Sequence, residues 1–434
     1  MKAIPWLLAF MASAALAGTT RAVRPGILIP PSAVDKDSSC DIGTYPAATL
    51  LLPYFEVEAK KHVNDAGNTI FSVVNTSRQP QIARVTLWTD YGYPALWFNV
   101  FLTGYDVASI SLYDVVANGV LPQTSSSAQV GARSRPNDAN PNITSIDECK
   151  SLGGPLPQAT IDSVVALLTA GTAEGECHYG GNHPMAVGYV TVDVVNSCSK
   201  VSPLDPDYYA KTLLFDNVLT GDYERVMPDK AVGNYAGGNP LVHIRAIPEG
   251  GPAGSVSTGL PYTFYDRFTP KAARRIDRRQ PLPSTFAARF IEGGTAAFHT
   301  EYTMWREAAT SAASGCAVAA NASVPYVSIV RFDEYENPTV GSSSGNRAFP
   351  VAAAAATTSS AFPPRVGASV SGWMFLELDN RAGVSASSPF SVARPSQNWI
   401  VIKMQAEGRY GVEYDATSIG NGCTNPIAGG GVVK

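Results

Sequence analysis

Apolar and polar residues alternate along much of the chain, a pattern typical of β-strands that bury one face. The stretch TIFSVVNTSRQPQIARVTLW, residues 69–88, shows the pattern on both sides of a short polar break. In its second part Ala83, Val85 and Leu87 share one face, because successive strand residues point to opposite sides. The break at residues 75–80 contains asparagine, serine and proline, which favour turns. The stretch therefore predicts two strands joined by a turn.

The same alternation continues before and after this stretch. Upstream, ATLLLPYFEVE indicates a buried strand that Pro53 interrupts. Downstream, apolar positions in residues 98–102 share one face, a turn is expected at 103–106, and a strand through Leu112 follows. Further strands are expected at residues 187–195, 241–247, 285–291, 298–305, 326–332, 373–378, 399–404 and 410–414. Short strands at this spacing favour an all-β, mainly antiparallel protein with immunoglobulin-like β-sandwich domains.

One segment, QATIDSVVALLTAG, has helical periodicity instead. Its apolar residues recur on one helix face, namely Ile161, Val164, Val165 and Leu168. Thr160 is a candidate N-cap and Gly171 can end the helix. Because the segment lies between Cys149 and Cys177, we expect residues 149–177 to form a small disulfide-bounded helical insertion on the β scaffold.

The first residues have the features of a secretory signal. Lys2 precedes an apolar run, and the Ala15–Ala17 tripeptide provides a small-x-small cleavage site. Cleavage after Ala22 is the alternative. The run is shorter than the roughly 20 apolar residues of a membrane span. We therefore expect residues 1–17 to be removed and the mature protein to be secreted, periplasmic or on the cell surface, with no transmembrane segment.

The chain of 434 residues is long enough for two domains or for one large domain with insertions. Residues 250–259 have the glycine, serine and proline content of a linker. We place a boundary there, between an N-terminal β-sandwich domain at 18–250 and a C-terminal β-rich domain at 260–434. Strand pairing across this boundary stays open.

Six cysteines lie beyond the signal and predict three disulfides in an exported chain. Six cysteines allow 15 connectivities, and the sequence does not choose among them. Proximity favours Cys149 with Cys177 and Cys316 with Cys423, which leaves Cys40 with Cys198. A zinc site at Cys177, His178 and His183 is less favoured, because the ligand spacing of known zinc sites is missing. No metal and no cofactor are expected.

Charged residues make up only 16% of the chain and the formal net charge is −4, so nucleic acid is not an expected partner. One local cluster is basic and consists of Arg267, Lys271, Arg274, Arg275, Arg278 and Arg279. Such a cluster can bind an anion or a protein partner. Prolines around it break regular structure, which favours a solvated loop.

Local catalytic signatures are weak: the sequence has no phosphate-binding loop, His-Glu-x-x-His pair or EF-hand, and its Gly-x-Ser-x-Gly string at residues 341–345 lies in a serine-rich low-complexity stretch. The five histidines are scattered, and we expect each to be structural or on the surface. Asp333 with Glu334 and Glu336 is a candidate carboxylate pair for glycoside hydrolysis, although these residues resemble a strand end that runs into a polar loop. The aspartates within residues 35–41 depart from the calcium-loop spacing.

Aromatic residues are concentrated in WTDYGYPALWFNVF, residues 88–101. Trp88, Tyr91, Tyr93 and Trp97 form a candidate ligand-binding platform, because exposed aromatic faces suit sugars and protein interfaces. By alternation, Trp88 and Trp97 point away from the face of Val85. They are therefore either exposed or covered by a second protein layer, and the second reading is favoured.

Several strings resemble segments of uncharacterised secreted bacterial proteins: LPYFEVE, FSVVNTS, VTLWTD, LTGYDV, RPSQNW and GRYGVEYDATSIGNGC. The resemblance spans most of the mature chain and implies export and a β-rich fold. It brings no activity and no functional residues.

These observations favour a non-catalytic exported β-sandwich protein that acts through surface interactions, as an envelope, adhesion or assembly component. Its partner would be a protein or a glycan surface. One alternative is a carbohydrate-binding protein or glycoside hydrolase. Another is a filament-forming subunit that assembles by strand addition to an exposed sheet edge.

Overall fold

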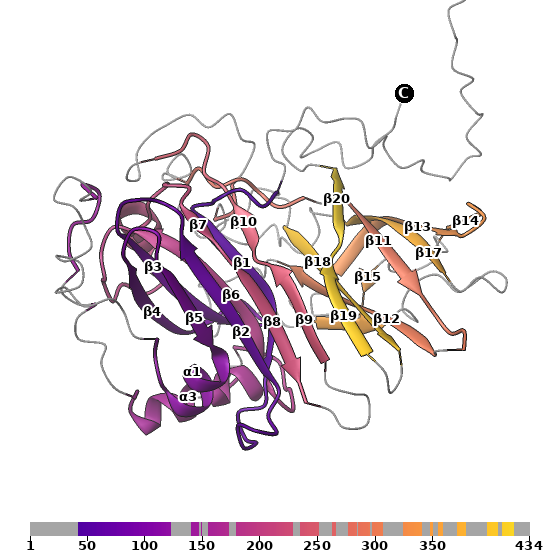
Figure 1. The fold of residues 1–434 in the computed structure, drawn as a ribbon, viewed down its shortest axis with the longest axis horizontal. Helices are drawn as coiled ribbons and strands as arrows, with labels where there is room; N and C mark the ends of the chain where they lie inside the picture. Colours follow the sequence, from indigo (N-terminus) through magenta and orange to yellow (C-terminus); the bar gives the residue numbers. More distant parts are fainter. Residues whose placement is uncertain are drawn as a thin grey trace, which may run out of the picture.

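The computed structural model describes residues 42–122, 140–146, 149, 155–172, 179–228, 235–250, 263–265, 277–283, 285–295, 297–306, 324–340, 348–349, 355–358, 371–378, 397–406 and 410–420. Strands dominate these residues and pair into antiparallel sheets (Figure 1). The prediction of an all-β, mainly antiparallel protein is confirmed.

Two sheets form the N-terminal half. The first sheet contains β1 (Thr49–Val57), β3 (Gln81–Thr89), β4 (Pro94–Leu102), β6 (Ala186–Val195) and β10 (Val242–Ile244), in the order β10-β1-β6-β3-β4. The second sheet contains β2 (Asn68–Asn75), β5 (Val107–Ser111), β7 (Leu219–Thr220), β8 (Asp222–Met227) and β9 (Tyr235–Pro240). Its order is β5-β2-β8-β9, and β7 also pairs with β2.

The two sheets bury one apolar core between them, as in a β-sandwich. Alternate residues of the first sheet, such as Val85 and Leu87 of β3, share this core with Phe71 and Val73 of β2. The face that alternation assigns to Ala83, Val85 and Leu87 is therefore the face that packs on the second sheet.

Pro53 interrupts the pairing of β1 without ending the strand. The antiparallel register of β1 and β6 runs through Leu52 opposite Val190, then shifts before Phe55 opposite Gly188. Proline has no amide N–H to give to a ladder, so a bulge at this position keeps both flanking segments paired. The predicted interruption is thus a local irregularity inside one long strand.

The two predicted turns join strands of different sheets. The turn at 75–80 connects β2 of the second sheet to β3 of the first, and the turn at 103–106 connects β4 back to β5. Fully buried Asn75 ties the two turns together, because its side-chain amide donates hydrogen bonds to the carbonyls of Gln79 and Thr103, at 2.8 and 2.9 Å. Strands that are consecutive in sequence are therefore not hairpin partners at these turns.

Helix α3 (Gln158–Thr169) confirms the predicted helix and buries Ile161, Val164 and Leu168. Thr160 lies inside the first turn and does not cap it, because the helix begins two residues earlier, after Pro157. At the other end Gly171 adopts a left-handed φ of 65°, the conformation that glycine favours after a helix.

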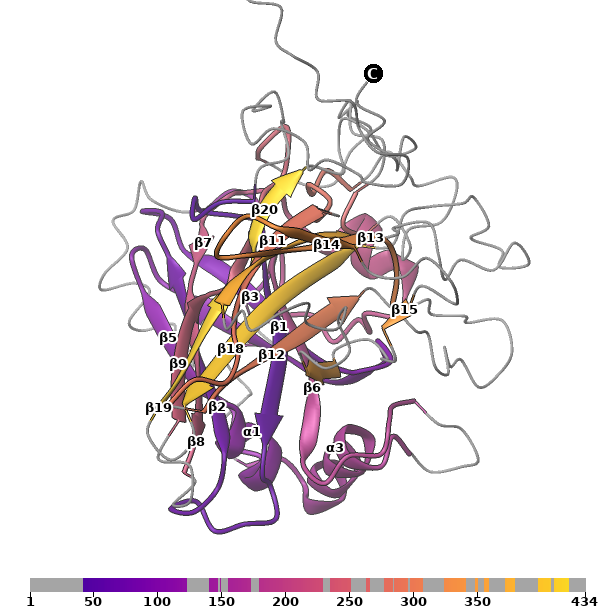
Figure 2. The same ribbon diagram turned by 90° about the vertical axis from the view of Figure 1, so that its right-hand side faces the viewer.

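A second helix, α1 (Leu112–Asn118), was not predicted. The expected strand through Leu112 is wrong at its end, because β5 stops at Ser111 and the Ser111 hydroxyl accepts a hydrogen bond from the amide of Asp114 as an N-cap. A single π-helical turn, η2 (Tyr208–Thr212), follows later in the chain. Figure 2 shows α1 and α3 close together at one end of the strands.

The disulfide between Cys149 and Cys198 corrects the predicted pairing. The bond has a Cα–Cα distance of 5.3 Å, so Cys149 does not pair with Cys177, and Cys198 does not pair with Cys40. It encloses α3 and also all of β6, rather than a helical insertion at 149–177. Cys40, Cys177, Cys316 and Cys423 lie outside the described residues.

The C-terminal half also contains two sheets. One has the order β14-β13-β17-β11-β20, with β15 also paired to β13, and contains β11 (Thr285–Ile291), β13 (Val324–Asp333), β14 (Pro338–Val340), β15 (Ala348–Phe349), β17 (Ser371–Leu378) and β20 (Thr417–Gly420). The other has the order β16-β12-β18-β19 and contains β12 (Phe298–Arg306), β16 (Ala355–Thr358), β18 (Asn398–Ala406) and β19 (Tyr410–Asp415).

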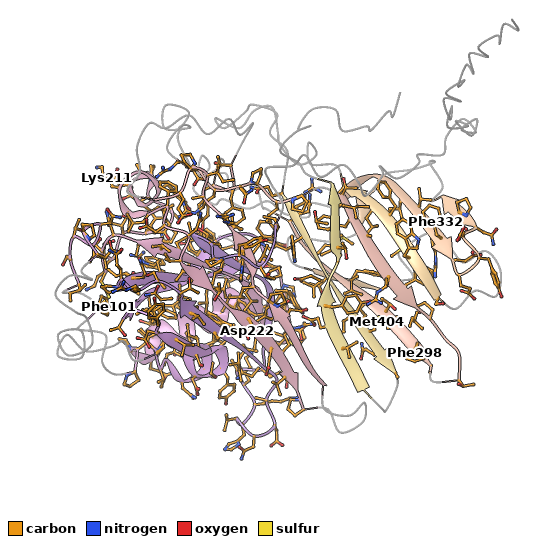
Figure 3. All side chains as sticks on the ribbon, turned by 45° about the horizontal axis from the view of Figure 1, so that its top comes forward. Phe101, Lys211, Asp222, Phe298, Phe332 and Met404 are labelled. Carbon is orange, nitrogen blue, oxygen red and sulfur yellow. A yellow bond between two sulfur atoms is a disulfide. The ribbon has the colours of Figure 1, made fainter. Side chains whose placement is uncertain are left out.

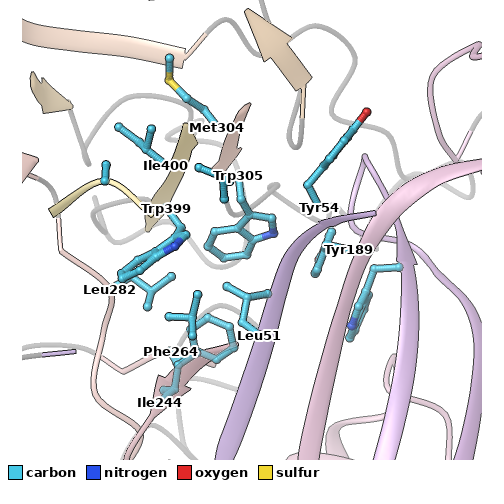
Figure 4. Packing of buried hydrophobic residues seen from close by; sticks show 14 of the residues in the cluster. Leu51, Tyr54, Tyr189, Ile244, Phe264, Leu282, Met304, Trp305, Trp399 and Ile400 are labelled. Carbon is cyan, nitrogen blue, oxygen red and sulfur yellow. The ribbon is translucent and has the colours of Figure 1, made fainter. Parts of the chain in front are cut away.

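The two halves share a hydrophobic core although the named strands of each half pair only within that half. Leu51 and Tyr189 of the first sheet belong to the same buried cluster as Trp305, Trp399 and Ile400 of the C-terminal half (Figure 4). The first sheet is therefore covered on both faces, by the second sheet and by C-terminal strands.

The segment that follows the expected boundary also holds the halves together. The amide of Gln280 donates to the carbonyl of Arg245, and the amide of Ile247 donates to the carbonyl of Arg278, both at 2.8 Å. Most of the expected linker at 250–259 lies outside the described residues. In the part of the chain that is described, no helix has the length and apolar character needed to cross a membrane.

Candidate functional site

Strand β4 ends the first sheet on one side, and its first residues are incompletely covered. Ala95, Leu96 and Trp97 are partly exposed, whereas the residues from Phe98 to Leu102 are buried. Figure 3 labels Phe101, which marks the buried end of this edge strand. Edge strands present backbone N–H and C=O groups that the sheet itself does not use.

A pocket of about 350 Å³ lies against this strand. It is lined by Ala95, Leu96, Trp97, Phe98 and Asn99 of β4, by Thr160 of α3, and by Cys198, Ser199 and Lys200. Side chains alternate between the two faces of a strand. A hollow that touches five consecutive strand residues must therefore lie beside the strand, along its backbone edge.

The wall opposite the strand is held by buried polar contacts. Asn99 donates from its side-chain amide to the carbonyl of Ser199 at 3.1 Å, and fully buried Arg84 donates to the Oδ1 atom of Asn99 at 2.6 Å. The Arg84 guanidinium also donates to the carbonyl of Val201 at 2.9 Å. Together with the disulfide at Cys198, these contacts fix residues 198–201 against the sheet.

The pocket combines an aromatic ring, apolar side chains and a few polar groups. Thr160 and Ser199 supply hydroxyls, and the exposed Lys200 supplies a positive charge. Lys200 forms no ion pair with any of the residues that the structure describes. Among the described residues that line the pocket there is no carboxylate and no histidine.

The four residues of the predicted aromatic platform have different surroundings. Trp88 is 1% exposed, its ring stacks on that of Tyr189 at 5.8 Å, and its indole N–H donates to the Thr191 hydroxyl. A platform that includes Trp88 is therefore wrong, because a second layer with Trp305, whose ring lies 5.6 Å from Tyr189, covers this position. Cover by protein, the favoured interpretation, holds for Trp88, whereas Trp97 is partly exposed.

The two platform tyrosines lie in the connection before β4. Both Tyr91 and Tyr93 are partly exposed, and Tyr93 stacks on Tyr179 at 4.1 Å. Burial raises the pKa of both phenols, so they stay protonated at neutral pH. Tyr93 therefore packs mainly against protein, and Trp97 is the platform residue that reaches the pocket.

A carboxylate and an imidazole meet beside these tyrosines. The buried Asp90 carboxylate lies 2.8 Å from the Nε2 atom of His183 and accepts a hydrogen bond from the amide of Gly181 at 2.9 Å. Residues 90 and 183 are far apart in sequence, so sequence reasoning missed the pair. Its geometry orients the imidazole and fixes the loop after Tyr179 to the end of β3. His178 and Cys177, proposed with His183 as zinc ligands, lie outside the described residues.

The predicted basic patch is wrong for two of its members. Arg279 is fully buried and Arg278 is 4% exposed, so neither belongs to a solvated surface. Arg279 pairs with Asp277 at 3.0 Å and lies 3.8 Å from Asp193. Paired arginines can be buried because the acid offsets their desolvation. Arg267, Lys271, Arg274 and Arg275 lie outside the described residues.

Asp193 of β6 is the centre of this buried network, which sequence reasoning also missed. Its carboxylate accepts hydrogen bonds from the hydroxyls of Thr49, Tyr208 and Tyr265 at 2.6–3.0 Å. Burial raises the pKa of Asp193, and the contacts with Arg279 and the hydroxyls oppose that shift. Because every one of these groups is enclosed, the network joins Tyr265 and Arg279 to the first sheet and is not open to a ligand.

A second buried ionic group joins the two halves. Arg225 of β8 pairs with Glu413 of β19 and lies 3.3 Å from Glu56 of β1. The Arg225 guanidinium also lies over the ring of Tyr54, at 5.0 Å. Strand β9 runs beside β19 at this junction (Figure 1). Both partners of the ion pair are nearly inaccessible, which identifies a structural contact.

The candidate catalytic carboxylates do not face the pocket. Asp333 ends β13 and accepts hydrogen bonds from the amides of Tyr335 and Asn337 and from the Asn337 side chain. The Asn337 contacts lower the pKa of Asp333. Glu334 and Glu336 follow in the same exposed turn, where Glu334 contacts Ser371. The reading of a strand end that runs into a polar loop is confirmed.

Within the described residues, no group of three or more His, Cys, Asp or Glu side chains is arranged to hold a metal ion. The aspartates of residues 35–41 lie outside that part of the chain. Compared with known proteins, the chain matches no protein-family model, and no curated protein or solved structure is significantly similar to it.

Proposed function

We propose that this chain is a non-catalytic, exported β-sandwich protein that acts through surface interactions as an envelope, adhesion or assembly component. We place its contact surface at the pocket beside β4. The observation that carries the proposal is a firmly held hollow at a sheet edge that combines Trp97, apolar side chains and an exposed lysine. Binding sites typically combine an apolar lining with a few placed polar groups.

Carbohydrate binding is the second candidate, and a specific observation favours it. Trp97 is partly exposed, and the hydroxyls of Thr160 and Ser199 line the same hollow. An aromatic ring with neighbouring hydrogen-bonding groups suits a sugar ring, whose faces are apolar and whose rim carries hydroxyls. Glycoside hydrolysis is not proposed here, because none of the described lining residues is a carboxylate.

A binding comparison tests the proposal. Mature wild-type protein and the Trp97→Ala variant are compared on a glycan array and in peptide panning, with Tyr335→Ala as control because Tyr335 is 77% exposed and lies in the turn after β13. We expect a ligand that wild type and Tyr335→Ala bind and that Trp97→Ala binds at least about tenfold more weakly. Ligand binding that is unchanged in a folded Trp97→Ala variant contradicts the proposed surface.

Export and the finer fold class belong to the same proposal. We expect N-terminal sequencing of protein secreted by a bacterial host to begin at Gly18, or at Val23 for the alternative cleavage site. Recovery only of cytoplasmic protein that begins at Met1 contradicts export. The two facing antiparallel sheets support an immunoglobulin-like assignment of the N-terminal half. An experimental structure with a strand order unlike that fold would remove the assignment and leave the β-sandwich.

A further inference from the structure

We infer that the pocket beside β4 binds an extended polypeptide segment, which adds to the first sheet as a further antiparallel or parallel strand and brings an acidic residue to Lys200. This inference rests on the proposed function, because it names the partner of the same surface. It rests on the placement of the pocket, on the lack of a second ladder partner for β4 among the described residues, and on the charge of Lys200 in the pocket lining.

The placement of the pocket selects an extended backbone. Residues 95–99 point alternately to the two faces of the sheet, yet all five line one hollow. The hollow therefore lies where the backbone groups of β4 point away from β3. A ligand in this position meets a repeating row of N–H and C=O groups, and an extended peptide is the ligand class that matches such a row.

The edge is free in the described part of the structure. β4 is the last strand in the order β10-β1-β6-β3-β4, and its ladder partner is β3 on one side. No backbone hydrogen bond joins residues 95–101 to a described segment other than β3. Proteins commonly protect such an edge with charge, proline or a covering loop. Here residues 198–200 form the opposite wall of a hollow of about 350 Å³ that also contacts residues 95–99 of the strand.

The side chains around the edge set the character of the partner. Trp97 offers an aromatic surface for an apolar side chain of the incoming strand. Lys200 is exposed and has no ion-pair partner among the described residues, so an acidic residue of the partner complements it. The expected motif is a short run of alternating apolar and polar residues with an aspartate or glutamate at one end.

The test uses the mature full-length chain and a phage-displayed library of random octapeptides. We expect panning on wild type, with counter-selection on Trp97→Ala, to enrich peptides with alternating apolar residues and one acidic residue. The binding affinity of a synthetic enriched peptide should fall by roughly fivefold in Lys200→Glu, because an exposed ion pair becomes a repulsion. Lys60→Glu is the matched control, because Lys60 is also an exposed lysine and does not line the pocket.

Backbone methylation separates strand addition from simple groove binding. In an extended peptide, alternate N–H groups point to opposite edges. N-methylation of one alternate set should therefore weaken binding more than about tenfold, while methylation of the other set leaves binding within about twofold. Equal tolerance of both methylated peptides, or no enrichment over Trp97→Ala, overturns strand addition. If a glycan binds and depends on Trp97 instead, the proposed surface stands and the peptide inference falls. If neither ligand class depends on Trp97, both fall.

Discussion

Trp88 and Trp97 lie on the same face of the first sheet but have opposite surroundings. Alternation correctly places both away from the core that the two N-terminal sheets share. Trp88 lies on β3, inside the sheet, where Tyr189 and the C-terminal Trp305 cover it. Trp97 lies on the edge strand β4 and opens onto a pocket. The face of a residue thus follows from its sequence position, whereas its cover depends on how far it is from the edge of the sheet.

The largest expected effect on stability is at Trp88, the covered tryptophan. Trp88→Ala removes a buried indole that is stacked and hydrogen-bonded, so we expect it to lower the free energy of unfolding by about 3–5 kcal/mol. Denaturant titration followed by circular dichroism measures the change. A loss below about 1 kcal/mol would show that the C-terminal cover is not stably packed.

Removal of the disulfide between Cys149 and Cys198 tests what holds the pocket beside β4 in place. Removing it with the double substitution Cys149→Ser and Cys198→Ser should lower the free energy of unfolding by about 2–4 kcal/mol. Because Cys198 lines the pocket, the same variant should bind a Trp97-dependent ligand more weakly, while the near-ultraviolet signal of the buried tryptophans is retained. Unchanged binding in the double-serine variant would mean that the buried Arg84 contacts alone hold residues 198–201 in place.

The pH dependence of stability at Asp415 tests the packing of the C-terminal strands that cover the first sheet. The carboxylate accepts a hydrogen bond from the indole N–H of Trp399, a member of the shared core, and burial raises the pKa of Asp415 to about 7. The folded protein therefore holds this proton more tightly than the unfolded chain does. The contribution to stability is full below about pH 4 and is lost as pH rises toward 7.

Asp415→Asn should remove this dependence. We expect wild type and variant to have equal free energies of unfolding near pH 4, and the variant to be more stable by roughly 1–3 kcal/mol at pH 8. Urea titrations of both proteins at several pH values measure this difference in the free energy of unfolding. The other titrating groups contribute equally in both proteins, so their contributions cancel. A difference that is constant with pH would contradict the raised pKa.

The smallest expected effect is on the edge residue. Trp97→Ala should change the free energy of unfolding by less than about 1 kcal/mol, because its side chain is partly exposed. The same substitution should weaken ligand binding at least about tenfold, so the main effect of Trp97→Ala is on binding and that of Trp88→Ala is on stability. A Trp97→Ala variant as unstable as Trp88→Ala would show that the edge residue is part of the core.

Strand positions could be predicted well because period-two alternation is a local signal. The expected strand at residues 285–291 coincides with β11, for example. The sequence gives no comparable signal for β8 and β9, where glycines and charged residues interrupt the pattern. Sheet partners could not be predicted at residues 75–80, because the same turn residues suit a hairpin and a crossover between sheets.

Of the residues that line the pocket, Trp97 could be singled out from the sequence but residues 198–200 could not. Local composition pointed to Trp97, whereas the opposite wall at residues 198–200 is brought to it by long-range pairing of β6 with β3. Sequence proximity likewise favoured the wrong cysteine, since Cys177 is closer to Cys149 in sequence but the folded path brings Cys198 to it. Asp90 and His183 meet for the same reason, and no periodicity along one strand records such a contact.

If the chain is exported as proposed, the cover of the first sheet by C-terminal strands also constrains the order of export and folding. A chain that crosses a membrane from its N-terminus presents β1, β3 and β6 long before residues 398–406 of β18 arrive. During that interval one apolar face of the first sheet has no cover, because Trp305 and Trp399 are still to emerge. Under the proposed export, the N-terminal half would need either a holding chaperone or a loose, incompletely packed state until almost the whole chain has been delivered.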